Sequence, residues 1–216
     1  MNRWTWLLIA GALAALLWAA GRHPNVEAPL ASAGQAAFDC RLPGPLPASE
    51  TEEPLQGPVP EGVGEFRLGA YRVRPLAGFS LQGRVLGRED YRFDRGAELA
   101  PTDLALGWGR MADPAHYSRL DIWQSGRWYR YRWGGDGPPL PEQEIARSSA
   151  NMHLVPANSA VASALSRVEP DQLVRLRGWL VEVQGEDGSV WRSSLSRNDT
   201  GDGACELIYV CELAAE

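Results

Sequence analysis

Apolar and polar residues alternate along three stretches of the chain. Residues 66–74 and 79–85 both show this period of two. Because successive side chains of a strand point to opposite faces, each stretch predicts a half-buried β-strand. Residues 127–133 alternate in the same way and follow the apolar run 120–123 after a short break at Gln124-Ser125-Gly126. Two such runs separated by a short glycine-containing break predict a β-hairpin.

Residues 178–211 contain three apolar runs separated by two turn clusters. The turns, at 185–188 and 198–203, are rich in Gly, Asp and Asn, residues that favour tight turns. This pattern predicts a closing β-meander. A further strand is predicted over residues 148–156. Short helices are predicted at 101–107, 142–146 and 159–167, the last with Asn158 as its N-cap.

These elements predict one α+β domain over residues 65–216, dominated by antiparallel strands. A small barrel like the oligomer-binding (OB) fold is the first choice, because a strand, a short helix and a closing meander recur in it. A curved open sheet packed on two short helices is the second choice. About 150 residues are enough for one compact domain of either kind.

The N-terminus carries the clearest single signal. Residues 4–20 contain no charged side chain, and only Thr5 is polar. A run of this length is at the short edge of a membrane-spanning helix, and Trp4, Trp6 and Trp18 lie near its ends, where interfacial aromatics belong. We interpret residues 1–22 as an uncleaved signal anchor; a cleaved signal peptide and a buried core helix are the alternatives. The expected location is the bacterial inner membrane, single-pass, with the C-terminal domain in the periplasm.

Residues 23–64 are predicted to be a Pro/Ala-rich linker. Eight prolines occur between residues 24 and 64, and proline neither continues a helix nor donates to a sheet ladder. Such chains are semi-extended spacers, so this segment is expected to hold the domain away from the membrane. The alternative is an ordered strip packed on the domain.

Charge and cysteine content narrow the functional classes. The net charge is −6 and all 21 basic residues are arginine. Nucleic-acid binding is disfavoured, because it usually requires a positive field. Cys205 and Cys211 are too far apart on one extended strand to bond to each other, whereas Cys40 can reach either. Buried apolar thiols in the strand are the favoured interpretation of Cys205 and Cys211, and a bond from Cys40 to either of them is the alternative.

The arginine–aromatic strand is the first candidate binding surface. Trp128, Arg130 and Arg132 share one face of this predicted strand. Together they can stack on and pair with an anionic ligand such as a glycan, a lipid headgroup or a peptide carboxylate. A half-buried strand with an arginine-lined solvent face is the favoured interpretation, because alternation alone produces it.

His153 is the second candidate. With a serine such as Ser149 and an aspartate it could form a hydrolase triad, but the chain has no G-x-S-x-G nucleophile elbow. A structural histidine on a strand is the favoured interpretation.

No cofactor or metal site is predicted. Asp199-Thr200-Gly201 matches the core of the aspartic-protease motif, but only one copy is present and polar residues precede it, so a tight turn is the favoured interpretation.

Three segments carry a resemblance. REDYRFDRGAELAPTDLALGWG, RSSANMHLVPAN and WRSSLSRNDTGDGACELIYV resemble a group of uncharacterised bacterial membrane-anchored proteins, which implies no activity and no catalytic residue. The layout is also similar to that of the haem chaperones of cytochrome maturation, but no histidine follows His153, so their H-x-x-x-Y motif is absent. The expected function is a non-enzymatic envelope protein that binds another protein or a cell-envelope polymer. A periplasmic hydrolase using His153 is the alternative.

Overall fold

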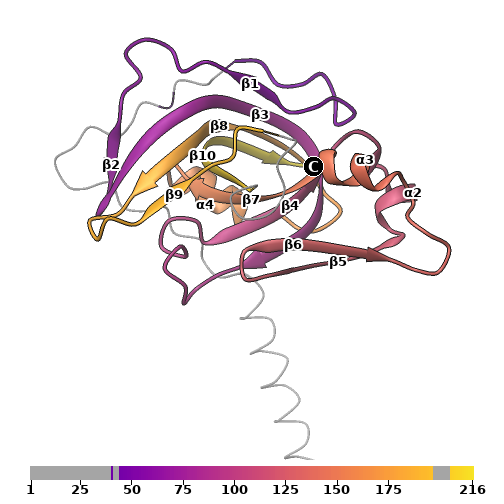
Figure 1. Ribbon diagram of the computed structural model, residues 1–216. Helices are drawn as coiled ribbons and strands as arrows, with labels where there is room; N and C mark the ends of the chain where they lie inside the picture. The colour runs from indigo at the N-terminus through magenta and orange to yellow at the C-terminus, as the bar shows by residue number, and fades with distance from the viewer. Residues whose placement is uncertain (1–39, 41–43, 197–204) are drawn as a thin grey trace, which may run out of the picture.

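Figure 1 shows the computed structural model of the chain, in which residues 40, 44–196 and 205–216 are described. The predicted membrane anchor at residues 4–20 and the turn around Asp199 lie outside these ranges. Among the described residues, no helix combines the length and the apolar character that crossing a membrane requires. The anchor therefore stays a prediction.

The described part is mainly antiparallel β-sheet with a few short helices, as the alternation predicts. The strands are β1 (Leu55–Gly57), β2 (Phe66–Leu68), β3 (Tyr71–Asp90), β4 (Thr102–Gly107), β5 (Leu120–Ser125), β6 (Trp128–Trp133), β7 (Ser149–Pro156), β8 (Leu173–Gln184), β9 (Val190–Arg192) and β10 (Glu206–Ala215). The helices are η1 (Gly109–Ala112), α2 (Pro114–Tyr117), α3 (Glu142–Arg147) and α4 (Ser159–Leu165).

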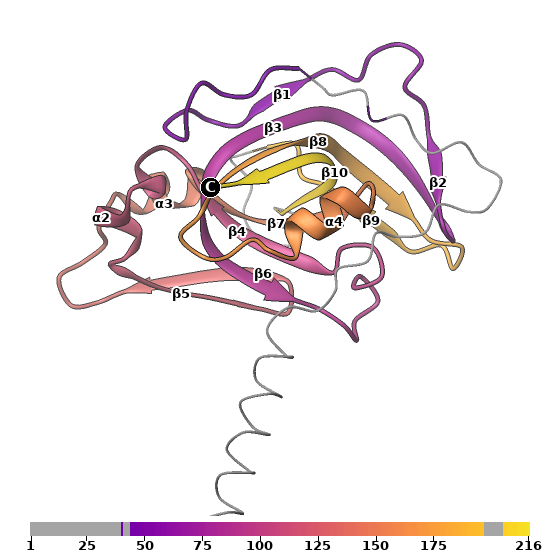
Figure 2. The same cartoon turned by 180° about the vertical axis from the view of Figure 1, so that it is seen from behind.

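Five strands form a closed ring of hydrogen-bonded pairs in the order β3, β4, β7, β10, β8 and back to β3. Only the β7–β10 pair in this ring is parallel. β3 closes the ring because it is 20 residues long: residues 72–84 pair with β8, and residues 84–90 pair with β4. Figures 1 and 2 show β3 curving around the other strands. α4 follows β7 and packs against β7 and β10.

Two sequence predictions are corrected along these strands. The alternation predicts two strands, at 66–74 and 79–85, but the first is divided: residues 66–68 form β2, and β3 begins at Tyr71 and continues through the second stretch. Register shifts at Pro75–Ala77 and Val85–Gly87 let β3 bend without breaking. Residues 101–107 were expected to include a short helix, but they form β4. Every residue of β4 is buried, and a short run that is mostly apolar does not distinguish a helix from a strand.

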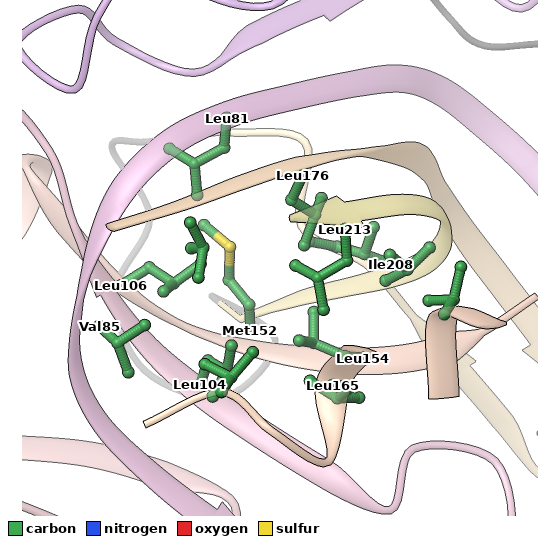
Figure 3. Packing of buried hydrophobic residues seen from close by; sticks show 14 of the residues in the cluster. Leu81, Val85, Leu104, Leu106, Met152, Leu154, Leu165, Leu176, Ile208 and Leu213 are labelled. Carbon is green, nitrogen blue, oxygen red and sulfur yellow. The ribbon is translucent and has the colours of Figure 1, made fainter. Parts of the chain in front are cut away.

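The hydrophobic core fills the inside of the ring. Figure 3 shows Leu104, Met152 and Ile208 converging from three different strands, and all three are fully buried. α4 covers this core with Val161 and Leu165. The predicted N-cap of α4 is confirmed, because the Asn158 side chain accepts a hydrogen bond from the Val161 amide at 3.0 Å. Since side chains alternate along a strand, the residues between these core positions point outwards.

The predicted hairpin is present as β5 and β6, a separate two-stranded sheet outside the ring (Figure 2). Gly126 and Arg127 form its two-residue turn, with positive φ at both positions, which is the geometry of a type I′ turn. One face of β6 carries Tyr129, Tyr131 and Trp133 against a cluster of buried residues that includes Ile145. The faces therefore divide as the alternation predicts.

The segment before residue 65 differs from the expected spacer. β1 pairs with β3, the Ser80 hydroxyl donates to the Pro45 carbonyl at 2.8 Å, and Arg177 donates to the Gly44 carbonyl at 3.1 Å. Proline-rich composition prevents a long ladder, but it permits a short strand at a sheet edge. From Gly44 onwards the chain is a strap on the ring.

The cysteine prediction is also corrected. Cys40 and Cys211 form a disulfide with a Cα–Cα distance of 5.6 Å, so they are not free thiols, and the partner of Cys40 is Cys211 rather than Cys205. Sequence separation did not reveal this pairing, because it depends on the strap returning across the sheet to β10. The disulfide joins the strap covalently to the last strand.

Candidate functional site

A cleft of about 480 Å³ opens between two connections of the ring, beside β9. One connection is the loop between β3 and β4, residues 91–101, and the other is the turn between β8 and β9, residues 185–189. The start of β3 closes the third side. The cleft is lined by Ala70, Tyr71, Arg95, Gly96, Glu98, Leu99, Val183, Gly185, Glu186, Asp187, Ser189, Val190 and Trp191. Its size is in the range of small-ligand and side-chain pockets.

Trp191 forms one wall of the cleft and is held in place from behind. It pairs with Val183 in the β8–β9 ladder. Its ring centroid lies 4.9 Å from that of His153, and the Arg127 guanidinium carbon lies 5.3 Å from the Trp191 ring. Gly96 approaches so closely that an added Cβ would come within 2.8 Å of the indole. Trp191 is therefore a fixed surface.

Behind Trp191 lies a buried polar cluster on the outer face of β4 and β7. Its centre is Asp103, which is completely buried. The Asp103 carboxylate lies 3.1 Å from Arg127 Nη1 and 2.9 Å from His153 Nδ1, and it accepts a hydrogen bond from Asn151 Nδ2 at 3.0 Å. His153 faces Asp103 because the two are register partners on adjacent strands. A buried carboxylate is tolerated only with such partners.

Arg127 joins this cluster to the 91–101 loop. Its guanidinium donates to both carboxylate oxygens of Asp94, at 2.9 and 2.7 Å, and to the Ala100 carbonyl at 2.9 Å. It also lies over the Tyr91 ring, 4.0 Å from the centroid. These hydrogen bonds hold the pKa of Asp94 below its usual range. The pKa of Tyr91 is raised, first by burial and then by the charge of Asp103.

The backbone of Arg127 is in the left-handed region, with φ of +67°, a conformation that costs free energy for a residue other than glycine. The contacts of its side chain offset this cost. In this position the tip of the hairpin reaches the 91–101 loop. The network therefore fixes the hairpin, the loop and Trp191 relative to one another.

The two residues of the hydrolase hypothesis are not brought together. The Ser149 hydroxyl donates to the Ile145 carbonyl at 2.7 Å, and four residues of strand, about 13 Å, separate Ser149 from His153. His153 Nδ1 lies 2.9 Å from the Asp103 carboxylate, but within the described ranges no serine hydroxyl bonds to His153. His153 is only 4% exposed. His153 packs on Trp191 and so supports the wall of the cleft from behind.

The three residues of the predicted arginine–aromatic surface lie on the outer face of the hairpin. Arg130 and Arg132 are exposed and Trp128 is half-buried. Arg132 pairs with Asp121 and lies over the Trp123 ring, 5.7 Å from its centroid. None of the three lines the cleft. Ligand binding on this face stays a prediction.

Trp191 and Asp103 were missed as site residues. Asp103 carried a usable signal, because it is a charged residue at the start of the otherwise apolar run Thr102–Gly107. Trp191 carried none, since its contact with His153 joins residues far apart in the sequence. No group of three or more His, Cys, Asp or Glu side chains in the described part of the chain is arranged to hold a metal ion.

Comparison with known proteins gives no match: no family model, curated protein or solved structure resembles the chain at a significant level. The resemblance to membrane-anchored bacterial proteins therefore stays a prediction.

Proposed function

We propose that this chain is a non-catalytic binding module whose ligand occupies the cleft between the 91–101 loop and the 185–189 turn. The observation that carries the proposal is the Trp191 wall. An aromatic ring faces a cleft of about 480 Å³ and is backed by His153 and Arg127. A rigid aromatic surface in a concave site binds at a low cost in conformational entropy.

The strand order supports an OB-type barrel as the finer description of the fold. The ring has five strands, and in chain order α4 lies between the third and the fourth of them, β7 and β8. OB folds bind their ligands on the face of the second and third strands and with the loops joining strands 1–2 and 4–5. Here these correspond to the outer face of β4 and β7, the 91–101 loop, and the connection that contains β9. This support is an analogy at the level of the fold.

The proposed location is the periplasmic side of the bacterial inner membrane. The Cys40–Cys211 disulfide supports an oxidising compartment, because such bonds persist mainly outside the cytosol. The apolar run at residues 4–20 would hold the module at the membrane. The disulfide lies 20 residues after the end of that run, so the chain between them limits how far the module can move from the bilayer.

Site-specific photo-crosslinking tests the proposal in native cells. Val190, which is 60% exposed and lines the cleft, is replaced by a benzophenone amino acid in the full chain. Leu55, exposed on β1 outside the cleft, is the matched control position. We expect a light-dependent adduct, measured by intact mass, from position 190 and not from position 55.

A second substitution, Trp191→Ala, should remove most of the adduct at position 190. Absence of any adduct at position 190, or equal adducts at both positions, would overturn the proposal.

A further inference from the structure

The rim of the cleft is acidic. Among the described residues, Glu98, Glu186 and Asp187 line it, against a single guanidinium, that of Arg95. The Glu186 and Asp187 side chains are 69% and 57% exposed. The pKa of Asp187 is lowered by its hydrogen bonds with Ser189, so this carboxylate stays ionised well below neutral pH. An anionic ligand would meet net repulsion here.

The ion pairs already present on the rim are weak enough to be exchanged. Arg95 reaches Asp187 at 3.5 Å, and its side chain is 92% exposed. Arg67 reaches Glu186 at 2.9 Å, and both side chains of this pair are well exposed. Exposed pairs of this kind contribute about 0–1 kcal/mol. An incoming cation can therefore replace either arginine at little cost.

The walls below the rim suit an apolar stem. Leu99 and Val183 are buried beneath the cleft, and Trp191 and Tyr71 supply aromatic surface. Lysine and arginine bury their methylene chains on such surfaces while their charged heads stay at a polar rim. The face of an indole also attracts cations. Arg127, the cation behind Trp191, is paired with two carboxylates, Asp94 and Asp103, so its charge is balanced.

We infer that the ligand of the cleft is a peptide segment of a protein partner that inserts a lysine or arginine side chain, with the stem on Trp191 and the head among Glu186 and Asp187. This inference rests on the proposed function and names its ligand class. A neutral glycan would use the aromatic wall but not the carboxylates. The acidic rim therefore favours the cationic peptide.

The test is a titration of the full chain in uncharged detergent micelles, followed by the indole N–H signal of Trp191, which is assigned by its absence in Trp191→Phe. The probes are acetyl-Ala-Lys-Ala-Lys-Ala-amide, the matching arginine and glutamate peptides, spermidine and a neutral trisaccharide. We expect saturable shifts with the lysine or arginine peptide, weaker binding at high salt, and no saturation with the glutamate peptide.

The variant Glu186→Gln/Asp187→Asn should weaken binding of the cationic peptide about five- to tenfold, as expected for the loss of two exposed charge contacts. The matched control, Glu53→Gln/Glu61→Gln, removes the same charge from two exposed positions outside the cleft and should change the affinity less than about twofold. Tighter binding of spermidine than of either cationic peptide would indicate that the ligand is a small polyamine and would overturn the peptide assignment.

Saturation by the trisaccharide alone, or binding that the cleft variant does not change, would also overturn the inference. The proposed function would survive these results if the crosslink at position 190 persists. Absence of that crosslink would overturn both the proposed function and the inference about the ligand.

Discussion

Two arginine–aspartate pairs at opposite ends of the hairpin show how burial changes what the same residues do. Arg127, at the tip, is 15% exposed, and its partner Asp103 is completely buried. Arg132, on the outer face, is 73% exposed, and Asp121 is 57% exposed. The first pair fixes the wall of the cleft from behind, whereas the second is a surface contact of little energetic weight. Both arginines belong to the same run, RWYRYRW, so their neighbours in the chain do not show which of them is buried.

The largest expected difference between the two regions is in stability. Asp103→Asn leaves Arg127 without its buried carboxylate partner, and breaking one side of a buried pair costs about 3–5 kcal/mol. Asp121→Asn, the matched change on the exposed pair, should cost less than about 1 kcal/mol. Urea unfolding followed by tryptophan fluorescence measures both. Equal losses for the two variants would mean that burial does not separate the pairs.

Loss of the disulfide has the next largest expected effect on stability. Cys40→Ser opens a loop that spans almost the whole domain, with a sequence separation of 171 residues, and the loss of such a cross-link costs about 2–5 kcal/mol. Because Cys40, Cys211 and Trp191 pack against the same hydrophobic cluster, the signal of Trp191 should shift as well. Cys205→Ser, outside the disulfide, is the control. A Cys40→Ser variant as stable as the parent chain would show that the strap is not held by this bond.

Close approach at the wall of the cleft gives a smaller effect. In Gly96→Ala the new methyl group meets the indole of Trp191 at 2.8 Å and the guanidinium of Arg127 at 3.2 Å, so overpacking should cost about 1–3 kcal/mol. Gly134→Ala, just after the hairpin, meets nothing within 4 Å and should be neutral. Differential scanning fluorimetry compares the two variants. A neutral Gly96→Ala would mean that the wall has room to move.

The smallest expected effect is on how far the stability of the fold decreases at acid pH. The pKa of Asp94 is lowered by its hydrogen bonds to Arg127, so its contribution is fully present above the ordinary carboxyl pKa, about 3.9. That contribution is lost as the pH falls through the lowered value. Asp94→Asn should therefore narrow the difference in urea midpoint between pH 5.5 and pH 3. An unchanged difference between the two urea midpoints would indicate that the pairing of Asp94 with Arg127 does not stabilise the fold.

The sequence predicted local features well where one face of an element meets the core. The division of β6 into a packed face with Tyr129 and Tyr131 and an open face with Arg130 and Arg132 follows from alternation alone. The N-cap at Asn158 follows from the preference of its side chain for a free helix amide. Such predictions need only neighbours in the chain.

Features that depend on distant partners were not predictable in this way. β3 is continuous because two bulges bend it around the ring, and the pattern of apolar residues does not encode a bulge. β4 is a strand because both of its faces are buried by other elements. The cleft itself joins the start of β3, the 91–101 loop and β9, and no local pattern links these three segments. The site is thus a product of ring closure.

The most direct test of the central claim compares crosslinking from the cleft with crosslinking from the hairpin face. A benzophenone amino acid is placed at Val190 in one variant of the full chain and at Arg130 in another, and light-induced adducts are measured in native cells. A ligand seated in the cleft predicts an adduct from position 190 and none from position 130. An adduct from position 130 alone would contradict it and would assign binding to the arginine–aromatic face.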